Sequence, residues 1–479
     1  MTENISDEMN REEEGYKAPS ILNTISYGSA GFWSMFAGSV FGTFVFYFYE
    51  AEVGLNVLFI MAAFIIYTIW NAINDPLLGH LTDKITKMTR KLGKRFPWIV
   101  IGIIPANFIF LLLFTPPDVN PAVNPWPMFF WLLITTCAYD TFVTLCFVNV
   151  DALFPDKFRT DSARRKGRGW GTPLSMLALP VAMIVPPFLF TYGQQETYVR
   201  MAIVAVLILV TVSIILLPGM WENKYLIDHY YLGEETRESF IQTLKTTIKQ
   251  KSFMIYIVLF FGFQLVTGSL TGSVTYAARF VLRGTEMDII WLFAAFLNGA
   301  LISVPIWIFI AKKVQNNKKM AVLGGALLVL GTFSTAFYVG LIDSLIYMAI
   351  LGFTMGNFWV LMTIYFADVL DERIVITKTD QRGATVGVQI FFGRFAALFQ
   401  AIIFATVHIL TGFPEGVTSW EELLLQSPTP YLAAFGIRLH MSVIPAFVLM
   451  ICTLVYWISY PLTQDKILLN KAKIKELGF

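Results

Sequence analysis

Long apolar stretches alternate with short polar segments along the whole 479-residue chain. Twelve of these stretches are long enough for a helix to cross a hydrocarbon layer of roughly 30 Å. We place them at residues 23–50, 53–80, 98–116, 127–154, 170–192, 197–220, 252–281, 287–311, 320–340, 344–369, 382–411 and 436–462. The pattern predicts an all-α integral membrane protein with twelve transmembrane helices.

The composition agrees with this prediction. Hydrophobic residues make up 56% of the chain and charged residues only 14%, whereas charged residues are about a quarter of a soluble domain. The mean hydropathy is +0.63. Cys137, Cys146 and Cys452 all lie in apolar stretches, which indicates packing residues rather than a disulfide framework or a metal site.

Basic residues gather in alternate connecting segments. Thirty of the 35 Lys and Arg residues lie in the N-terminal segment, in the loops after the even-numbered helices and in the C-terminal segment. The loops on the other side are short and acidic or neutral. Because basic residues concentrate on the cytoplasmic side of membrane proteins, both termini are predicted to be cytoplasmic. The regular sorting also supports the number of twelve helices.

A charged connector with an amphipathic piece around 235–251 divides the chain near its middle. Six predicted helices lie on each side, and each set has a basic loop after its second helix, at 83–95 and at 312–319. Such repetition is typical of secondary transporters. The predicted parts are a cytoplasmic tail at 1–22, a six-helix half at 23–220, a cytoplasmic linker at 221–251, a second half at 252–462 and a cytoplasmic tail at 463–479.

The second predicted helix carries a polar face. Asn71, Asn74 and Asp75 follow the spacing i, i+3, i+4, which places them on one side of a helix. A carboxylate inside the bilayer is costly and usually lines a cavity or an ion path. Asp75 is therefore a candidate ion-binding residue.

Several motifs carry a resemblance to a known family. The segment NDPLLG at 74–79 is followed by RKLGKRFPW at 90–98, and further matches are SYGSAGFW at 26–33, ALFPD at 152–156, ADVLDE at 367–372, where the tenth helix is expected to end, and GVQIFFGRFA at 387–396. With these motifs the chain resembles the glycoside–pentoside–hexuronide:cation symporters, the melibiose permease group of the major facilitator superfamily. The resemblance implies the major facilitator fold, alternating access, a place in the plasma membrane and a single chain sufficient for transport.

The resemblance also implies a cation site. Its members use two Asp and one Asn of the second helix and a Thr of the fourth. The matching residues here are Asn71, Asp75, Asn74 and Thr144, so one carboxylate is replaced by Asn71. Asp140 precedes Thr144 by one helical turn and shares its face. Our hypothesis is that Asp140 restores the second carboxylate; the alternative is that Asp140 lines the substrate path or pairs with an Arg.

Arg394 matches a family Lys on the eleventh helix that faces the acidic cluster. A guanidinium inside the bilayer requires an acid or an anionic substrate. Asp75 and Asp140 are the expected partners, and Arg394 is expected to leave its partner when a cation binds.

The positions that hold sugar hydroxyls in the family are different in this chain. The family's Lys–Asp pair on the first helix and its Asp on the fourth match Ser34, Met35 and Phe147. Three further residues are candidates for the cavity. Asp151 matches a family Trp near the sugar, Arg168 matches a family Arg that contacts the substrate, and Trp359 offers a ring for stacking. Met35 and Phe147 cannot make the charge-assisted hydrogen bonds that a hexose requires.

The basic loop after the second helix is a candidate cytoplasmic gate. Its charges would hold the two halves together through acidic partners, and the candidate residues are Asp83, Arg90, Lys94, Arg95 and Asp371. The alternative is that these charges only set the orientation in the membrane.

We therefore predict a secondary active transporter that couples a cation to a sugar, a glycoside or a related small organic solute. The alternative solute is a lysolipid-like amphiphile, because Met35 and Phe147 suit an acyl chain and a eukaryotic lysolipid carrier shares the family pattern. Na⁺ or H⁺ is the expected coupling ion, with no other cofactor, no resident metal and no nucleic-acid partner. An enzyme is not indicated: the chain has no GxxxxGK[ST], HExxH or GxSxG pattern, and its four His residues are scattered along the sequence.

Overall fold

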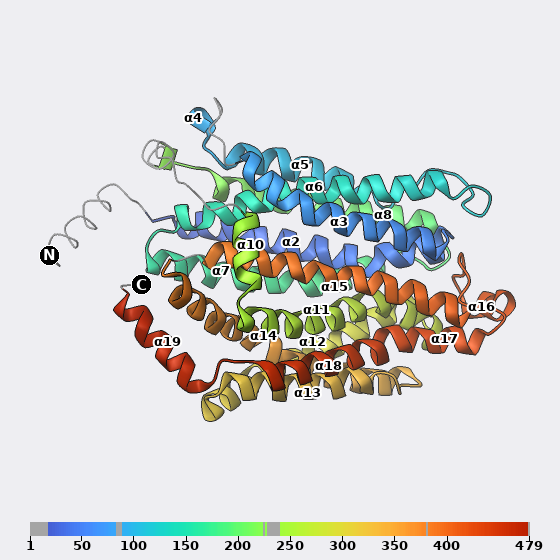
Figure 1. Cartoon of the computed structure of the whole chain (residues 1–479). Coiled ribbons are helices and arrows are strands. Elements are labelled where there is room, and N and C mark those ends of the chain that lie inside the picture. The colour runs from blue at the N-terminus through green and yellow to red at the C-terminus, as the bar shows by residue number, and fades with distance from the viewer. Residues whose placement is uncertain (1–17, 83–88, 224–225, 228–239, 380–381, 478–479) are drawn as a thin grey trace.

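The computed structural model describes residues 18–82, 89–223, 226–227, 240–379 and 382–477. All regular structure in these ranges is helical, and the long helices run roughly side by side (Figure 1). In the first half they are α2 (Ile21–Tyr47), continued by the π-helical turn η1 (Phe48–Glu52), then α3 (Val57–Thr82), α5 (Phe96–Leu112), α6 (Trp126–Lys157), α7 (Asp161–Ile184) and α8 (Gln195–Met220).

The second half repeats this series. It contains α11 (Lys251–Tyr276) with η3 (Ala277–Val281), α12 (Glu286–Val314), α13 (Asn317–Ser334), α14 (Leu341–Thr377), α15 (Arg382–Thr411) and the run α17 (Pro430–Arg438), η4 (Leu439–Val443) and α18 (Ile444–Ser459). Shorter helices are α4 (Thr89–Leu92), η2 (Pro186–Phe188), α10 (Phe240–Ile248), α16 (Trp420–Gln426) and α19 (Gln464–Glu476).

The helices overlap every apolar stretch that the sequence marks, but they differ in length. Ten helices in the described ranges are long and apolar enough to cross a membrane. The apolar helix α5 has 17 residues, which spans only about 26 Å at 1.5 Å per residue, and α13 has 18 residues. The protein is thus a multi-pass membrane protein, and the number of twelve spans stays a prediction.

Two predicted boundaries are wrong. The helix expected at 170–192 begins at Asp161, because the Thr160 side chain accepts a hydrogen bond from the Ala163 backbone N–H at 3.2 Å and caps it. Arg168 therefore lies within α7. The motif ADVLDE does not end its helix: α14 continues to Thr377, where Lys378 takes the left-handed conformation that closes many helices.

The two halves have the same internal packing. In the first half α2 contacts α7 and α8, α5 contacts α6 and α8, and α3 contacts α6. In the second half the equivalent helices make the equivalent contacts: α11 with α15 and α18, α13 with α14 and α18, and α12 with α14. Between the halves α2 meets α11, α3 meets α15, and α7 meets α12. This repetition is the architecture of an internal repeat.

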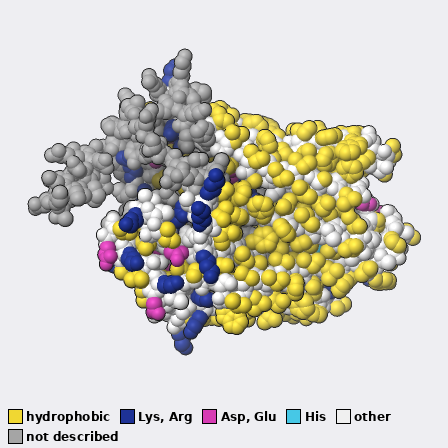
Figure 2. Space-filling view, viewed as in Figure 1, with side chains coloured by type: hydrophobic (Ala, Val, Ile, Leu, Met, Phe, Trp, Pro, Cys, Tyr) yellow, Lys and Arg dark blue, Asp and Glu magenta, His cyan; other side chains and the backbone are white. Residues whose placement is uncertain are grey.

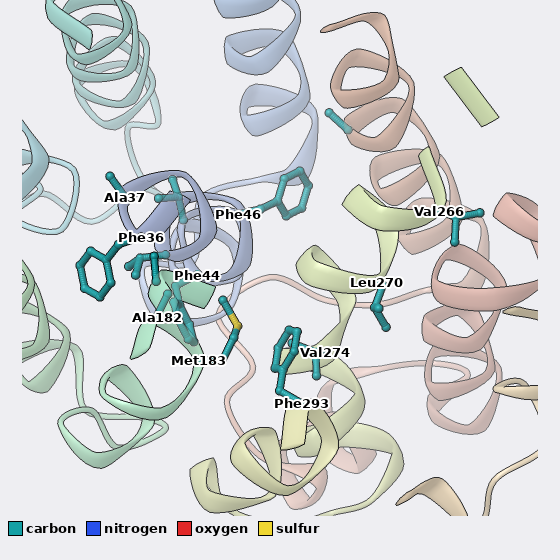
Figure 3. Packing of buried hydrophobic residues seen from close by; sticks show 14 of the residues in the cluster. Phe36, Ala37, Phe44, Phe46, Ala182, Met183, Val266, Leu270, Val274 and Phe293 are labelled. Carbon is teal, nitrogen blue, oxygen red and sulfur yellow. The ribbon is translucent and has the colours of Figure 1, made fainter. Parts of the chain in front are cut away.

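Large and small apolar side chains fill the space around α2. Phe36, Ala37 and Phe44 of α2 cluster with Ala182 and Met183 of α7, and Leu270 and Val274 of α11 lie on the side of the other half (Figure 3). These contacts pack α2 against α7 of its own half and against α11 of the other half.

The two ends of the helix bundle differ in charge. The end that holds α4, α10 and α19 is here called the α19 end, and the end that holds α16, η1 and η3 is called the α16 end (Figure 1). Figure 2 shows Lys and Arg side chains gathered at the α19 end, next to an apolar surface that covers the length of the helices. The distribution fits a membrane protein with a basic cytoplasmic face.

A buried carboxylate fixes the start of α5. Glu222 is almost fully buried, and its Oε2 accepts hydrogen bonds from the backbone N–H groups of Arg95 at 2.9 Å and Phe96 at 3.0 Å. The first N–H groups of a helix have no partner within the helix. Glu222 supplies that partner and ties the segment after α8 to α5.

Replacing Glu222 by Ala is expected to lower the stability of the folded protein by about 1–3 kcal/mol, because one buried and one partly buried N–H group lose their acceptor. The measurement is the thermal unfolding midpoint of the purified protein in detergent. Glu421→Ala, at an exposed position of α16, is the control. An equal midpoint for the two variants would contradict the capping role.

Candidate cation site and substrate path

Two carboxylates face each other across the packed helices α3 and α6. Thr144 of α6 donates a hydrogen bond to Asp75 Oδ1 of α3 at 2.9 Å. Asn74 of α3 donates to Asp140 Oδ2 of α6 at 3.2 Å. Each carboxylate thus has a polar partner on the opposite helix, as the spacing of these residues on their own helices allows.

Arg394 joins this cluster from the other half of the molecule. Its guanidinium forms an ion pair with Asp75 Oδ2 and donates a hydrogen bond to the backbone oxygen of Asn71 at 2.8 Å. The positive charge of Arg394 also acts on Asp140. The Arg394 and Asp75 side chains remain 22% and 26% exposed, so the pair is accessible to a small ion.

Asn71 leaves one oxygen available at the same place. Its side chain is largely buried, and its Nδ2 lies 3.5 Å from the Tyr67 hydroxyl. Its Oδ1 is buried and accepts no hydrogen bond from the described part of the chain. Buried acceptors normally have a partner, so Asn71 Oδ1 together with the Asp75 and Thr144 oxygens fits a hard monovalent cation.

The predicted cavity residues of α2 and α6 include two partly accessible apolar side chains, Met35 and Phe147. Ser34 and Met35 are exposed, Met35 to 45%, although α2 lies between α7, α8 and α11. Phe147 is half-buried, and its ring lies 5.4 Å from that of Trp33. Trp359 contacts Phe296 edge to face at 5.8 Å, within the second half.

The two charged cavity candidates, Asp151 and Arg168, lie on α6 and α7 of the first half. Asp151 is exposed on α6, and its charge interacts with that of Arg168 on α7. The Arg168 guanidinium lies 4.5 Å from the centre of the Phe154 ring, within the range of a cation–π contact. Asp151 and Arg168 thus form a charged patch, with Asp151 one helical turn after Phe147 on α6.

Two of the gate candidates have contacts within their own halves. Arg95 is buried and donates from NH1 to Asn149 Oδ1 at 3.2 Å in the first half. Asp371 pairs with Arg382 at 3.6 Å in the second half. Asp83 and the side chain of Arg90 lie outside the described residues, and Lys94 is half-buried. A latch between the halves at this loop stays a prediction.

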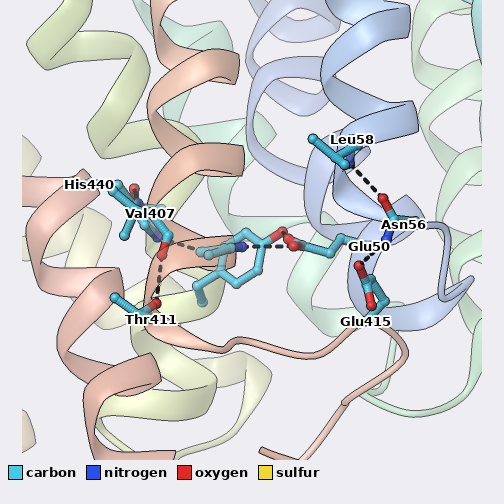
Figure 4. A network of polar contacts seen from close by, with 10 residues as sticks. Glu50, Asn56, Leu58, Val407, Thr411, Glu415 and His440 are labelled. Atoms are coloured by element: carbon cyan, nitrogen blue, oxygen red, sulfur yellow. Dashed lines mark hydrogen bonds and ion pairs between the residues drawn. The ribbon is translucent and has the colours of Figure 1, made fainter. Parts of the chain in front are cut away.

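Sequence reasoning missed a second polar cluster. The four His residues are scattered along the sequence, but two of them meet in the fold: His408 Nε2 lies 3.1 Å from His440 Nε2, and His408 Nδ1 lies 2.7 Å from Glu50 Oε1. Figure 4 shows this contact between the halves. The available signal was a Glu at the end of one apolar stretch and His residues inside two others.

Comparison with known proteins identifies the family. A family model described as "MFS/sugar transport protein" matches residues 26–464. The chain belongs to this family. The resemblance to melibiose-permease-like symporters is confirmed, and so is the prediction of a cation-coupled symporter of the major facilitator superfamily.

Two relatives of this symporter match over most of their length. The "Sodium-dependent lysophosphatidylcholine symporter 1" of Xenopus tropicalis is 22% identical over 85% of this chain and 81% of the relative. The "Sodium-dependent lysophosphatidylcholine symporter 1-A" of Danio rerio is 21% identical over 98% of this chain and 90% of the relative. The "Inner membrane symporter YicJ" of Escherichia coli is 26% identical over 21% of each chain.

A solved structure supports the fold of this family member. The nucleoside transporter NupG superposes with a TM-score of 0.55 at 15% identity, covering 90% of this chain and 98% of that protein. The family and the fold are those of membrane transporters.

Proposed function

We propose that this symporter couples the entry of Na⁺ to the movement of its solute, with Asp75 as the ligand that carries the coupling. The observation that supports this proposal is the ion pair between Asp75 and Arg394, because it joins α3 of one half to α15 of the other at the only carboxylate of α3 inside its described span. A cation at Asp75 competes with the guanidinium. Its binding therefore changes the contact between the halves.

The oxygen donors around Asp75 suit a hard cation. Thr144 Oγ1 already contacts the carboxylate, Asn71 Oδ1 lacks a partner among the described residues, and Asn74 holds Asp140 alongside. Pro76 follows Asp75 within the helix and has no N–H, so the backbone carbonyl of Ala72 loses its usual helical donor. The relatives named as sodium-dependent support Na⁺.

The proposed cycle is alternating access of two halves, 23–220 and 252–462, linked by 221–251. Contacts between the halves close the α16 end: Asn56 donates to Glu415 Oε1 at 2.7 Å, and Tyr192 donates its N–H to Glu286 Oε1 at 2.6 Å. The half-exposed site then opens towards the α19 end. We assign that end to the cytoplasm of a plasma-membrane protein because it is basic, and a single chain is sufficient for the cycle.

For the solute we propose a lysolipid-like amphiphile. Met35 and Phe147 offer an apolar surface where the family's sugar-binding carboxylates are expected. The charged patch of Asp151 and Arg168 beside it can take a zwitterionic head group. The relatives that match over most of this chain are named for lysophosphatidylcholine.

A glycoside is the second candidate solute. The family description names sugar transport, and Asp151 with Arg168 can form charge-assisted hydrogen bonds to hydroxyl groups. Trp359, half-buried on α14, offers a ring for stacking.

Uptake into proteoliposomes tests the proposal. Labelled lysophosphatidylcholine is expected to accumulate when a Na⁺ gradient is present. When Na⁺ is equal on both sides, its uptake should stop at equal concentrations inside and outside. Labelled melibiose and glucuronide are not expected to accumulate. Met35→Asp introduces a charge that a bound acyl chain would cover, and it should reduce lysolipid uptake about tenfold or more. Accumulation of a sugar but not of the lysolipid would favour the second candidate.

A further inference from the structure

A buried titratable cluster closes the α16 end of the molecule. Its members, here called the histidine cluster, are Glu50, Ser273, Tyr276, His408 and His440. Glu50, His408 and His440 have no exposed surface. None of these residues belongs to the cation site around Asp75, and the transport cycle proposed above does not use them.

Hydrogen bonds run through the cluster as a chain. The Tyr276 hydroxyl donates to Glu50 Oε2, and His408 Nδ1 donates to Glu50 Oε1 at 2.7 Å. His408 Nε2 faces His440 Nε2 at 3.1 Å, and His440 Nδ1 faces Ser273 Oγ at 2.8 Å. The orientation of the protons along this chain therefore depends on the charge of His408.

The cluster connects the two halves. Glu50 lies in η1 of the first half, whereas Ser273 and Tyr276 lie in α11, His408 in α15 and His440 in η4. In Figure 4 the Glu50 side chain reaches from α2 and η1 towards the helices of the second half. Any movement that separates the halves at this end must pull the Glu50 carboxylate away from His408 and Tyr276.

The chain of contacts admits two protonation states that differ by one proton. With His408 neutral, its Nδ1–H donates to Glu50, and its Nε2 accepts from His440 Nε2–H, while His440 Nδ1 accepts from Ser273. With His408 as the imidazolium, both of its N–H groups donate, His440 Nε2 becomes the acceptor, and His440 Nδ1–H donates to Ser273 Oγ. The second state pairs the buried carboxylate with a positive charge, and a buried charge without a counter-charge is costly.

We propose that the histidine cluster is a proton-binding site that locks the α16 end closed. The proton enters from water at that end and is held on the imidazole of His408, between Glu50 and His440. When the halves separate there, His408 loses its carboxylate partner and returns the proton to the same water.

Other charged groups at the α16 end have partners of their own. Glu52 accepts hydrogen bonds from Tyr198 and Gly193, and Glu286 accepts from the Tyr192 N–H. Arg279 donates to the Thr418 carbonyl. The groups that face the cluster itself are Tyr47, whose ring lies 4.8 Å from that of Tyr276, and the rings of Phe404 and Phe413, which pack on His440 and His408. The cluster is thus shielded by aromatic rings.

The proposal predicts how acidity acts on the two conformations. The closed state holds one proton more than the open state, so acidification favours closure and alkaline solution favours opening. For a single linked proton the ratio of the two populations changes by up to about tenfold per pH unit.

Distance measurement between two spin labels tests the proposal on the full-length protein. Labels are attached to Cys at Val123 and Ile342, which are 82% and 80% exposed and lie in opposite halves at the α16 end, after Cys137, Cys146 and Cys452 are replaced by Ser. The long-distance population should rise as the pH is raised in nanodiscs without any solute. The Glu50→Gln variant has no buried carboxylate charge, so its α16 end should stay closed at high pH. In the His408→Gln variant the label distances should no longer depend on pH.

Glu415→Gln is the matched control, because Glu415 also contacts the first half at this end, through Asn56, but lies outside the histidine cluster; it should keep the pH dependence. Distances that do not change with pH, or a His408→Gln variant that responds like the unmodified protein, would overturn the proposal. Should His408→Gln not fold, isotope labelling of the four His residues gives a second measurement on the unmodified protein. The His408 imidazole signal must titrate together with the distance, and a signal that stays constant overturns the proposal equally.

The outcome is separable from that of the proposed function. Asp75→Asn is expected to remove every effect of Na⁺ on the same distances and to preserve the effect of pH. Loss of both responses in that variant would contradict an independent proton site.

Discussion

Replacing Asp75 by Asn is expected to abolish accumulation of solute against a gradient. The variant keeps an oxygen that accepts from Thr144 but loses the negative charge that a cation and Arg394 share. Without that charge a cation gains little from binding, so its gradient no longer drives the cycle. Exchange of labelled for unlabelled solute, which needs no cation gradient, is expected to continue.

Two measurements check this result. In proteoliposomes the accumulation ratio should fall to equality between the two sides. In thermal unfolding, Na⁺ at about 100 times its dissociation constant stabilises the unmodified protein by about 2.7 kcal/mol, and this stabilisation should vanish in Asp75→Asn. Asp118→Asn, at an exposed position between α5 and α6, is the control, because it makes the same Asp-to-Asn change outside the site.

Asp75→Asn leaves Arg394 in its half-buried place without an acid partner, and this alone costs stability. The double variant Asp75→Asn with Arg394→Gln removes both charges and should fold better than the single variant while still lacking Na⁺-driven accumulation. Accumulation that persists in either variant would show that the coupling ion binds elsewhere.

Replacing Arg394 by Gln is expected to tighten Na⁺ binding and to weaken coupling. The guanidinium occupies the Asp75 carboxylate that we propose as the cation ligand, and a hydrogen bond to a charged group contributes about 1.5–3 kcal/mol. Removing this competitor should raise the Na⁺ affinity by roughly tenfold to a hundredfold. Accumulation should fall, because cation binding at Asp75 then no longer breaks an ion pair between α3 and α15.

A Na⁺ titration of the intrinsic Trp fluorescence measures the affinity. Arg382→Gln lies on the same helix and also loses a contact with an acid, Asp371, so it is the matched control and should leave the Na⁺ affinity unchanged. Weaker Na⁺ binding in Arg394→Gln would mean that the guanidinium supports the site rather than competing for it.

The contacts around Asp75 were partly predictable, because the spacing within each helix is local and the family resemblance pairs the helices. Helical spacing places Asn74 and Asp75 on one face of α3, and Asp140 and Thr144 on one face of α6. The two faces meet in the structure. Arg394 was predicted from a charge deep inside an apolar stretch, which needs a partner wherever the fold places it.

The histidine cluster was not predictable in the same way. Glu50 and His408 are 358 positions apart in the sequence, and no spacing rule links residues that meet only when two halves close. Glu50 also lies at the end of its apolar stretch, where a carboxylate facing water is the ordinary expectation. The early start of α7 depends on Thr160 as a cap, which an apolar pattern does not reveal.

The pairing of Asp75 with Arg394 has an electrical consequence. In the proposed cycle the opposite charges of Asp75 and Arg394 cancel in the empty carrier, so this pair adds no net charge to the return step. When Na⁺ replaces the guanidinium at Asp75 in that cycle, Asp75, Arg394 and the bound ion together carry one positive charge in excess. A membrane voltage of 100 mV, negative inside, then contributes about 2.3 kcal/mol to the loaded inward step, and transport of a zwitterionic solute generates an inward current.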